Sequence, residues 1–244
     1  MVLVHGYLGG SSQWDAQVQF LSPHFDVIAV DLAGYGNAHH LTAPTEMAAH
    51  AQAVLATLDQ LGVVCFHLLG HSMGGMVAQE IVHLAPARVR KLVLYGTGPQ
   101  GSLPGRFETM ARSRERLAQD GVERTARRIC ATWLLDNEAS PAFKSLAALA
   151  TRASEQAARN GLIAMEAWDG RDRLAAIQQP TLVVWGERDR SYGWSQIEKL
   201  WRTIPRASLA VLPACSHALH LERTALFHTL LLEFLVSDEA AARP

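Results

Sequence analysis

A serine flanked by glycines is the most specific chemical feature of the sequence. Gly70-His71-Ser72-Met73-Gly74 follows an apolar run at 66–69 and precedes a helical pattern that begins near Met73. A serine on so sharp a turn sits in a strained backbone, and side chains two positions to either side would collide with the turn. The helix N-terminus adds a partial positive charge that favours developing negative charge. The motif predicts a nucleophile at Ser72, while we interpret His71 as a packing or loop residue.

A histidine that could activate this serine lies near the end of the chain. The apolar run at 208–212 leads into Pro213-Ala214-Cys215-Ser216-His217. A histidine on the loop after the last strand can reach back over the strand ends, where open α/β sheets bind their ligands. His220 is the alternative, but we expect it to begin the final helical region. A base at His217 beside a serine nucleophile would support acyl transfer to water through an acyl-enzyme.

Short apolar runs alternate with longer helical patterns, and this alternation predicts an α/β fold. We expect a mostly parallel sheet with helices on both faces, because several runs are apolar without alternation. The expected strands span 2–4, 26–30, 66–69, 91–94, 181–185 and 208–212, and the expected helices include 45–61, 73–84, 195–203 and 224–235.

One interval interrupts this rhythm. From residue 99 to 179 there is no convincing strand pattern, only helical sequence rich in Ala, Arg, Glu and Leu. Such a length exceeds a simple crossover. We expect residues 99–179 to form a helical cap inserted into a core of residues 1–98 and 180–244. A second independent domain is the alternative, and it is disfavoured because the strand pattern resumes just after Pro180.

Together these motifs resemble the α/β-hydrolase superfamily, nearly from end to end. His5-Gly6 resembles the oxyanion loop of that family. Residues 31–36, Asp-Leu-Ala-Gly-Tyr-Gly, resemble its D-x-P-G-x-G turn, with Ala33 where proline is usual. The order of nucleophile, cap, acid and base also matches. One departure is Ser216, where relatives commonly have glycine.

The resemblance implies roles for further residues. It makes Asp189 the acid that orients His217, in preference to Glu187, which we interpret as a solvated loop residue. It places the two backbone oxyanion donors at Met73 and Tyr7. It also makes His5 a residue that braces the oxyanion loop rather than a catalytic one.

The resemblance also narrows the reaction. The sequence looks most like the carboxylesterase and enol-lactonase branch, in which Ser-Met-Gly-Gly is frequent, so we expect a hydrolase of small carboxylic esters or lactones. Carbon–carbon bond hydrolases of ring-fission products commonly carry a His-Gly-x-Gly-Pro-Gly loop and a tryptophan after the histidine, and Ala218 stands there instead. Perhydrolase or haloperoxidase-like activity is a further alternative. A small-molecule receptor with a vestigial hydrolase site is the alternative from a different class.

The cap would decide the substrate. Trp133, Phe143, Met165 and Trp168 could line the pocket, although a place in the core of the cap is the favoured interpretation of each. Between residues 106 and 128 there are seven arginines against four acids. They would favour an anionic substrate, or else form a solvated helix face with pairs such as Asp120–Arg124 and Glu123–Arg127.

Composition excludes several classes of function. The 244 residues carry a formal net charge of −1, which disfavours a nucleic-acid binder. The three cysteines are far apart and fit neither a disulfide framework nor a zinc site. No metal site, cofactor motif or membrane span is expected, and we predict a cytoplasmic protein.

Members of the family usually carry two strands before the His-Gly strand. Without these strands, the strand at 26–30 would lie at the edge of the sheet. An uncovered edge can pair with a second copy of the chain, so a homodimer is possible and the oligomeric state stays open.

Overall fold

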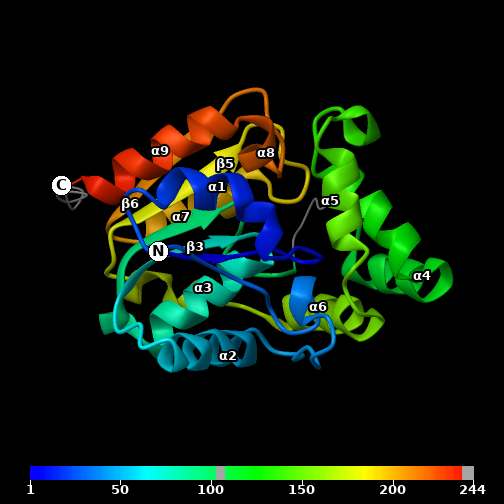
Figure 1. Cartoon of the computed structure of the whole chain (residues 1–244), viewed down its shortest axis with the longest axis horizontal. Coiled ribbons are helices and arrows are strands. Elements are labelled where there is room, and N and C mark those ends of the chain that lie inside the picture. The colour runs from blue at the N-terminus through cyan, green and yellow to red at the C-terminus, as the bar shows by residue number, and fades with distance from the viewer. Residues whose placement is uncertain (103–107, 238–244) are drawn as a thin grey trace.

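Six parallel strands form the centre of the protein, with helices on both sides (Figure 1). The computed structural model describes residues 1–102 and 108–237. The strands are β1 (Val2–Val4), β2 (Ile28–Val30), β3 (Phe66–His71), β4 (Val89–Tyr95), β5 (Thr181–Gly186) and β6 (Ala207–Leu212). Their order across the sheet is β2-β1-β3-β4-β5-β6, and all neighbours are parallel. The predicted α/β fold is confirmed, and β2 lies at an edge as expected.

Helices bury both faces of this sheet. They are α1 (Asp15–Leu21), α2 (Met47–Gln60), α3 (Met73–Leu84), α7 (Trp194–Thr203), α8 (Leu219–Glu222) and α9 (Thr224–Val236). Leu68 and Leu92 pack in the apolar cluster with α2, α3 and α7, whereas Leu69 and Val93 pack in a second cluster with α1 and α9. Consecutive residues of a strand face opposite sides, so a strand buried on both faces needs an unbroken apolar run.

The segment between β4 and β5 is helical. It contains α4 (Met110–Thr132), α5 (Phe143–Ala150), α6 (Glu155–Ala167) and the short helices η4 (Asn137–Ala139) and η5 (Arg171–Ala176). Figure 1 shows α4, α5 and α6 together at one end of the sheet. Their buried residues share one apolar cluster with the α2 and α3 side of the sheet. We keep the name cap for residues 99–179, and the exact division from the core stays a prediction.

The parallel arrangement directs five loops to the same edge of the sheet. In the register of β3 with its neighbours, Gly70 lies opposite Val4 of β1 and Leu94 of β4. The loops that follow β1, β3, β4, β5 and β6 therefore leave the sheet side by side, beneath the cap. None of the described helices is both long and apolar enough to cross a membrane.

The turn after β3 brings backbone segments into close contact, and this contact requires glycine. A Cβ on Gly74 would collide with the carbonyl oxygen of His5 and lie 2.5 Å from that of Val4. The first turn of α3 thus rests directly on the end of β1.

We predict that Gly74→Ala lowers the free energy of unfolding by about 2 kcal/mol or more, because the added methyl group has no room. Gly193→Ala is the matched control: its φ is −86°, and a Cβ there meets nothing within 4 Å. Urea unfolding of both variants checks the prediction. Equal stability of Gly74→Ala and wild type would contradict it.

Candidate active site

The turn that carries Ser72 is as tight as its motif predicts. β3 ends one residue before Ser72 and α3 begins one residue after it. Ser72 has φ 55° and ψ −121°, a backbone conformation that residues other than glycine rarely adopt. Its N–H donates to Tyr95 O at 2.9 Å, and its carbonyl accepts from Gly75 N–H and Thr97 Oγ1 at 2.8 Å each. These hydrogen bonds hold the strained residue in place.

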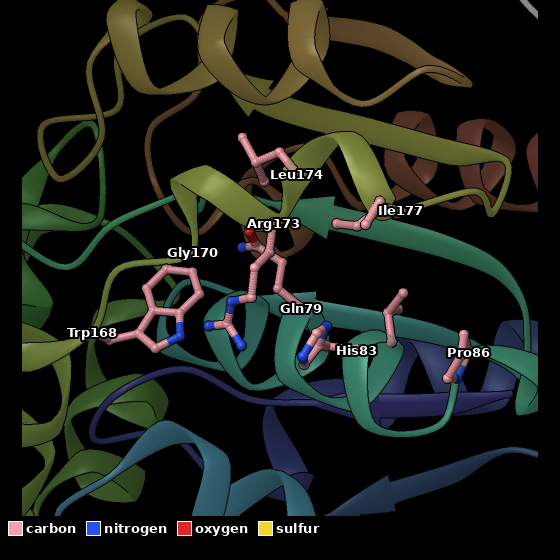
Figure 2. A pocket seen from close by; sticks show the side chains of 10 residues that line it. Gln79, His83, Pro86, Trp168, Gly170, Arg173, Leu174 and Ile177 are labelled. Atoms are coloured by element: carbon pink, nitrogen blue, oxygen red, sulfur yellow. The ribbon is translucent and has the colours of Figure 1, made fainter.

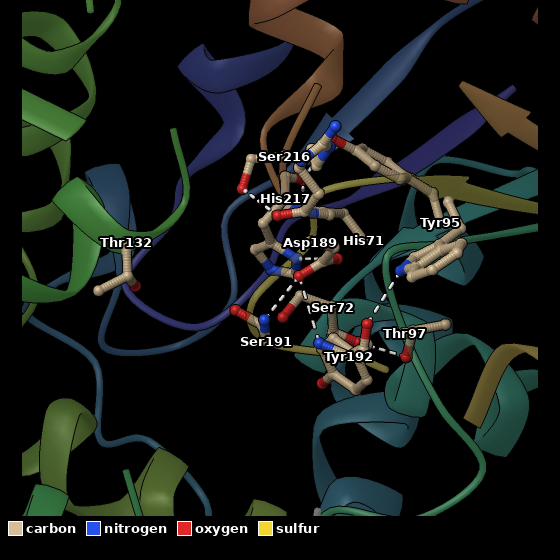
Figure 3. A network of polar contacts seen from close by, with 12 residues as sticks. His71, Ser72, Tyr95, Thr97, Thr132, Asp189, Ser191, Tyr192, Ser216 and His217 are labelled. Carbon is tan, nitrogen blue, oxygen red and sulfur yellow. Dashed lines mark hydrogen bonds and ion pairs between the residues drawn. The ribbon is translucent and has the colours of Figure 1, made fainter. Parts of the chain in front are cut away.

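His217 and Asp189 form a buried pair. His217 Nδ1 donates to Asp189 Oδ2 at 2.8 Å, and the two side chains are 1% and 0% exposed. The other carboxylate oxygen accepts from the N–H groups of Ser191 (2.7 Å) and Tyr192 (3.2 Å). Because Nδ1 carries the proton, Nε2 of His217 is left as an acceptor. Within the described residues, this buried Nε2 has no hydrogen-bond partner (Figure 3).

Ser72 and His217 line the same small cavity, which has an empty volume of about 260 Å³ when its opening to solvent is included. The structure therefore brings together the predicted nucleophile, base and acid. The lining residues are Gly6, Tyr7, Gln13, His71, Ser72, Trp133, Leu146, His217, Ala218 and His220. No Arg or Lys is among them, and no group of three or more His, Cys, Asp or Glu in the described chain is placed to hold a metal ion.

The loop after β1 lies against the serine. A Cβ on Gly6 would come within 2.9 Å of Ser72 Cβ, so only glycine allows this approach. Tyr7, the next residue, lines the cavity, and its hydroxyl donates to Ala158 O of the cap at 2.7 Å. Met73 is the first residue of α3, so its N–H has no acceptor within the helix. The two residues predicted as backbone oxyanion donors thus lie on either side of Ser72.

His5 braces this loop, as its position led us to expect. Its Nδ1 donates to Gly6 O at 2.8 Å and its Nε2 accepts from Leu32 N–H at 2.9 Å. Burial lowers the pKa of His5 to about 4, so the ring is neutral near pH 7. It connects the oxyanion loop to the turn after β2.

The aromatic rings of Tyr95, His71 and His220 form a layer that supports the backbone of His217. Tyr95 OH donates to the His217 carbonyl at 2.7 Å, and His71 Nε2 donates to the same oxygen at 3.2 Å. The His71 ring stacks on Tyr95 with 4.3 Å between ring centroids, and His220 Nδ1 lies 2.9 Å from Tyr95 OH. His71 packs as expected, and sequence reasoning missed the role of Tyr95.

His220, the alternative base, and Glu187, the alternative acid, lie outside the buried pair of His217 and Asp189. His220 is hydrogen-bonded to Tyr95, and the carboxylate of Asp189 is bonded to His217. Glu187 is exposed and accepts from Ala214 N–H at 3.3 Å. The geometry therefore pairs Asp189 with His217.

Of the four residues predicted to line the substrate pocket, the structure brings Trp133 to Ser72. Phe143 packs beneath the guanidinium of Arg127, which lies 5.2 Å from its ring centroid. Met165 is buried in α6, where its backbone meets Gly101. Trp168 donates to Glu80 Oε1 at 2.7 Å and lines a separate cavity between α3 and η5 (Figure 2). These three side chains pack in the cap or between cap and core. Leu146 lines the Ser72 cavity, and no sequence pattern distinguished it.

The arginines of α4 form ion pairs within the cap and do not line the Ser72 cavity. Arg106 lies outside the described residues. The ion pairs are Arg112–Glu115, Arg114–Glu166, Arg116–Glu108, Arg124–Asp120, Arg127–Glu138 and Arg128–Glu108. The expected pair of Asp120 with Arg124 is present. Arg127 pairs with Glu138 where we expected Glu123. The alternative of an ion-paired helix face is therefore the one that the structure supports.

The strand order, the serine turn and the buried His–Asp pair together define a fold class. A family model described as the alpha/beta hydrolase fold matches residues 1–224, and the chain belongs to this family.

Several members of the family are similar over nearly the whole chain. The "Putative carbamate hydrolase RutD" of Agrobacterium fabrum is 28% identical over 96% of this chain and 92% of its own. The 2-hydroxy-6-oxononadienedioate/2-hydroxy-6-oxononatrienedioate hydrolase of Burkholderia vietnamiensis is 30% identical over 96% of this chain and 86% of its own. A thermophilic esterase from Thermogutta terrifontis superposes with a TM-score of 0.87 at 26% identity. The match covers 96% of this chain and 88% of the esterase chain. Hydrolysis is common to these names, whereas the bond cleaved differs.

The buried histidines predict a loss of stability in mild acid. Burial lowers the pKa of His5 to about 4 and that of His220 to about 3, from an ordinary value of 6.5. Burial, followed by the charges of His217 and His220, also lowers the pKa of His71. At pH values well above 6.5, these rings are neutral in the folded and in the unfolded protein, so their ionisation does not affect the free energy of unfolding. As the pH falls below 6.5, the unfolded chain binds protons that the folded protein cannot accept, so unfolding becomes easier.

We expect the free energy of unfolding to fall by roughly 2 kcal/mol or more between pH 7 and pH 5, and to change little between pH 8 and pH 7. Urea titrations at the three pH values measure it. His220→Phe removes one buried ionisable ring and should reduce this loss, whereas the exposed His24→Gln should leave it unchanged. Equal stability of wild type at pH 7 and pH 5 would contradict the prediction.

Proposed function

We propose that the protein hydrolyses small, uncharged carboxylic esters or lactones, with Ser72 as nucleophile, His217 as base and Asp189 as the acid that orients the base. The observation that carries this proposal is the buried Nε2 of His217. It is an acceptor without a partner among the described residues, and it lines one cavity together with Ser72. A buried acceptor in that position can take the serine proton.

The reaction proceeds in two halves. Ser72 Oγ attacks the ester carbonyl carbon while its proton passes to His217 Nε2. The oxyanion of the tetrahedral intermediate accepts hydrogen bonds from the N–H groups of Tyr7 and Met73. His217 then gives the proton to the leaving alcohol, and the acyl group stays on Ser72. In the second half, water attacks the acyl-enzyme with His217 again as the base.

Asp189 acts through the ring of His217. Its Oδ2 fixes the proton on Nδ1, which leaves Nε2 free to accept, and it stabilises the imidazolium that forms in each half. The N–H groups of Ser191 and Tyr192 keep the carboxylate in its orientation.

The cavity favours a short, neutral acyl group. Its empty volume is about 260 Å³, and Trp133, Leu146 and Ala218 contribute apolar walls. A buried carboxylate would need a cationic partner, and neither Arg nor Lys is among the described residues that line the cavity. Each misplaced methylene costs about 1–3 kcal/mol in such a pocket, so activity should fall steeply with acyl length.

Carbon–carbon bond hydrolysis is the second candidate, because a relative with 30% identity carries that kind of name. The dioate in that name bears two carboxylates, and the neutral lining of the Ser72 cavity disfavours such a substrate. The loop after β1 also lacks the expected Pro-Gly sequence. We therefore rank it below ester hydrolysis.

A panel of substrates tests the proposed reaction. p-Nitrophenyl acetate and butyrate should turn over many times per enzyme, equally with and without EDTA, and octanoate and palmitate should be slower by at least about tenfold. An enol-lactone, a p-nitrophenyl carbamate and a ring-fission dienoate are compared beside them. Highest activity on palmitate, the carbamate or the dienoate would contradict the proposal. Release of one equivalent of nitrophenol without turnover would favour the receptor alternative, and faster peracid formation than hydrolysis would favour a perhydrolase.

Ser72→Ala should lower kcat for p-nitrophenyl acetate by more than about 10³-fold, because the three residues act as a unit. Circular dichroism and urea unfolding check that the variant is folded. A folded variant with a tenth of wild-type activity would disprove the assignment of Ser72.

The two neighbouring histidines should differ in their effect. His217→Ala should abolish ester turnover, because only a positioned base accepts the serine proton. His220→Asn retains a donor toward Tyr95 OH and should change kcat by less than about tenfold. Steady-state rates at pH 8 compare them. If His220→Asn were the inactive variant, His220 would be the base.

A further inference from the structure

The first residue after α4 is tied to the loop that carries the proposed base. Trp133 O accepts a hydrogen bond from Ala218 N–H at 3.0 Å. Ala218 follows His217 directly in the chain, and the rings of Trp133 and His217 lie 5.8 Å apart. The cap thus meets this loop on the C-terminal side of the histidine.

Glu222 makes the equivalent connection on the other side. Its Oε2 accepts from Ser216 N–H at 2.7 Å, and Ser216 directly precedes His217. Its Oε1 accepts from Leu135 N–H of the cap, also at 2.7 Å. Hydrogen bonds of this length to an ionised carboxylate are among the stronger ones in proteins. One half-buried side chain therefore connects the cap segment 133–135 to the loop of the base.

A second loop, which follows β5, holds the same cap segment independently. Arg190, which follows Asp189, donates through Nη2 to Leu134 O at 2.8 Å and to Leu135 O at 3.3 Å. Its Nη1 donates to Asn137 Oδ1 at 3.0 Å. Loss of Glu222 would therefore loosen this segment without releasing the cap.

The position of the segment matters because of what it supports. Trp133 and Ala218 both line the Ser72 cavity, together with Leu146 of α5. A displacement of residues 133–135 would move the indole of Trp133 away from Ser72 and lengthen the space available to an acyl group. The size of the cavity thus depends on a carboxylate that does not line it.

We propose that Glu222 is a positioning residue that holds Trp133 over the Ser72 cavity and thereby limits the length of the acyl group. This inference rests on the proposed ester hydrolysis at Ser72. Glu222 acts through the backbone of Leu135 and Ser216, and it does not contact the reacting atoms.

The test compares Glu222→Ala and Glu222→Gln with Glu187→Gln. Glu187 is the matched control, because its carboxylate also accepts a backbone N–H from this loop, that of Ala214, but is exposed. The readout is the ratio of kcat/KM for p-nitrophenyl octanoate to that for the acetate. Glu222→Ala should raise this ratio by at least about tenfold, the equivalent of one lost hydrogen bond to a charged group. Glu222→Gln keeps one oxygen acceptor, so its ratio should lie between those of wild type and Glu222→Ala. The ratio of Glu187→Gln should match that of wild type.

A structural role alone would give a different result. If both substrates slowed equally in Glu222→Ala, or if the ratio stayed within about twofold of wild type, the proposal would be overturned. Amide hydrogen exchange provides a readout that needs no substrate: exchange at Leu135 and Ser216 should be faster in Glu222→Ala. If wild type hydrolysed no ester, the proposed function would fail, and this exchange would still decide whether Glu222 holds the segment. Unchanged exchange would overturn the inference.

Discussion

The end of β1 with the loop that follows it, and the turn that carries Ser72, meet with no room for a side chain between them. Gly6 presses against the serine itself, and Gly74 rests on the carbonyl groups at the end of β1. This contact sets the distance between the first loop and the start of α3, and hence between the two proposed oxyanion donors. Ser72 itself has a positive φ, and hydrogen bonds to Tyr95 and Thr97 hold it there. The geometry of the reaction centre thus follows from packing that only glycine permits.

In the proposed reaction, His217 must present Nε2 to Ser72 in a fixed orientation. Asp189 fixes one side of the ring, while Tyr95 and His71 hold the backbone carbonyl of the same residue. Much of this support is made of buried, neutral rings that resist protonation. The layer that orients the base should therefore also limit the stability of the protein in acid.

The sequence predicted the sheet, and it indicated a candidate nucleophile at Ser72, because both depend on local patterns. Every expected strand is present, because mainly apolar runs such as 66–69 and 91–94 favour burial on both faces of a sheet. Ser72 carries its own signature in the flanking glycines. His217 was predicted from its place on the loop after the last strand, whereas Asp189 required the family resemblance, because it meets a residue 28 positions away only through the strand order.

The lining of the cavity was harder to predict from sequence. Trp168 and Leu146 are both apolar residues of the cap, and only tertiary packing directs one to Glu80 and the other to Ser72. Tyr95 lies one residue past the expected strand at 91–94, and nothing local indicated that its hydroxyl holds the carbonyl of His217. Glu222 gave no signal because its two partners are backbone N–H groups, which every sequence offers.

The central claim is that catalysis passes through an acyl group on Ser72. Rapid acid quench during turnover of p-nitrophenyl acetate, followed by peptide mass spectrometry, tests it most directly. The account predicts an acetyl group on the peptide that contains Ser72, formed and lost at rates that match turnover, and absent in Ser72→Ala. Turnover at the wild-type rate with no acetyl group on that peptide, or with the label on another residue, would contradict it.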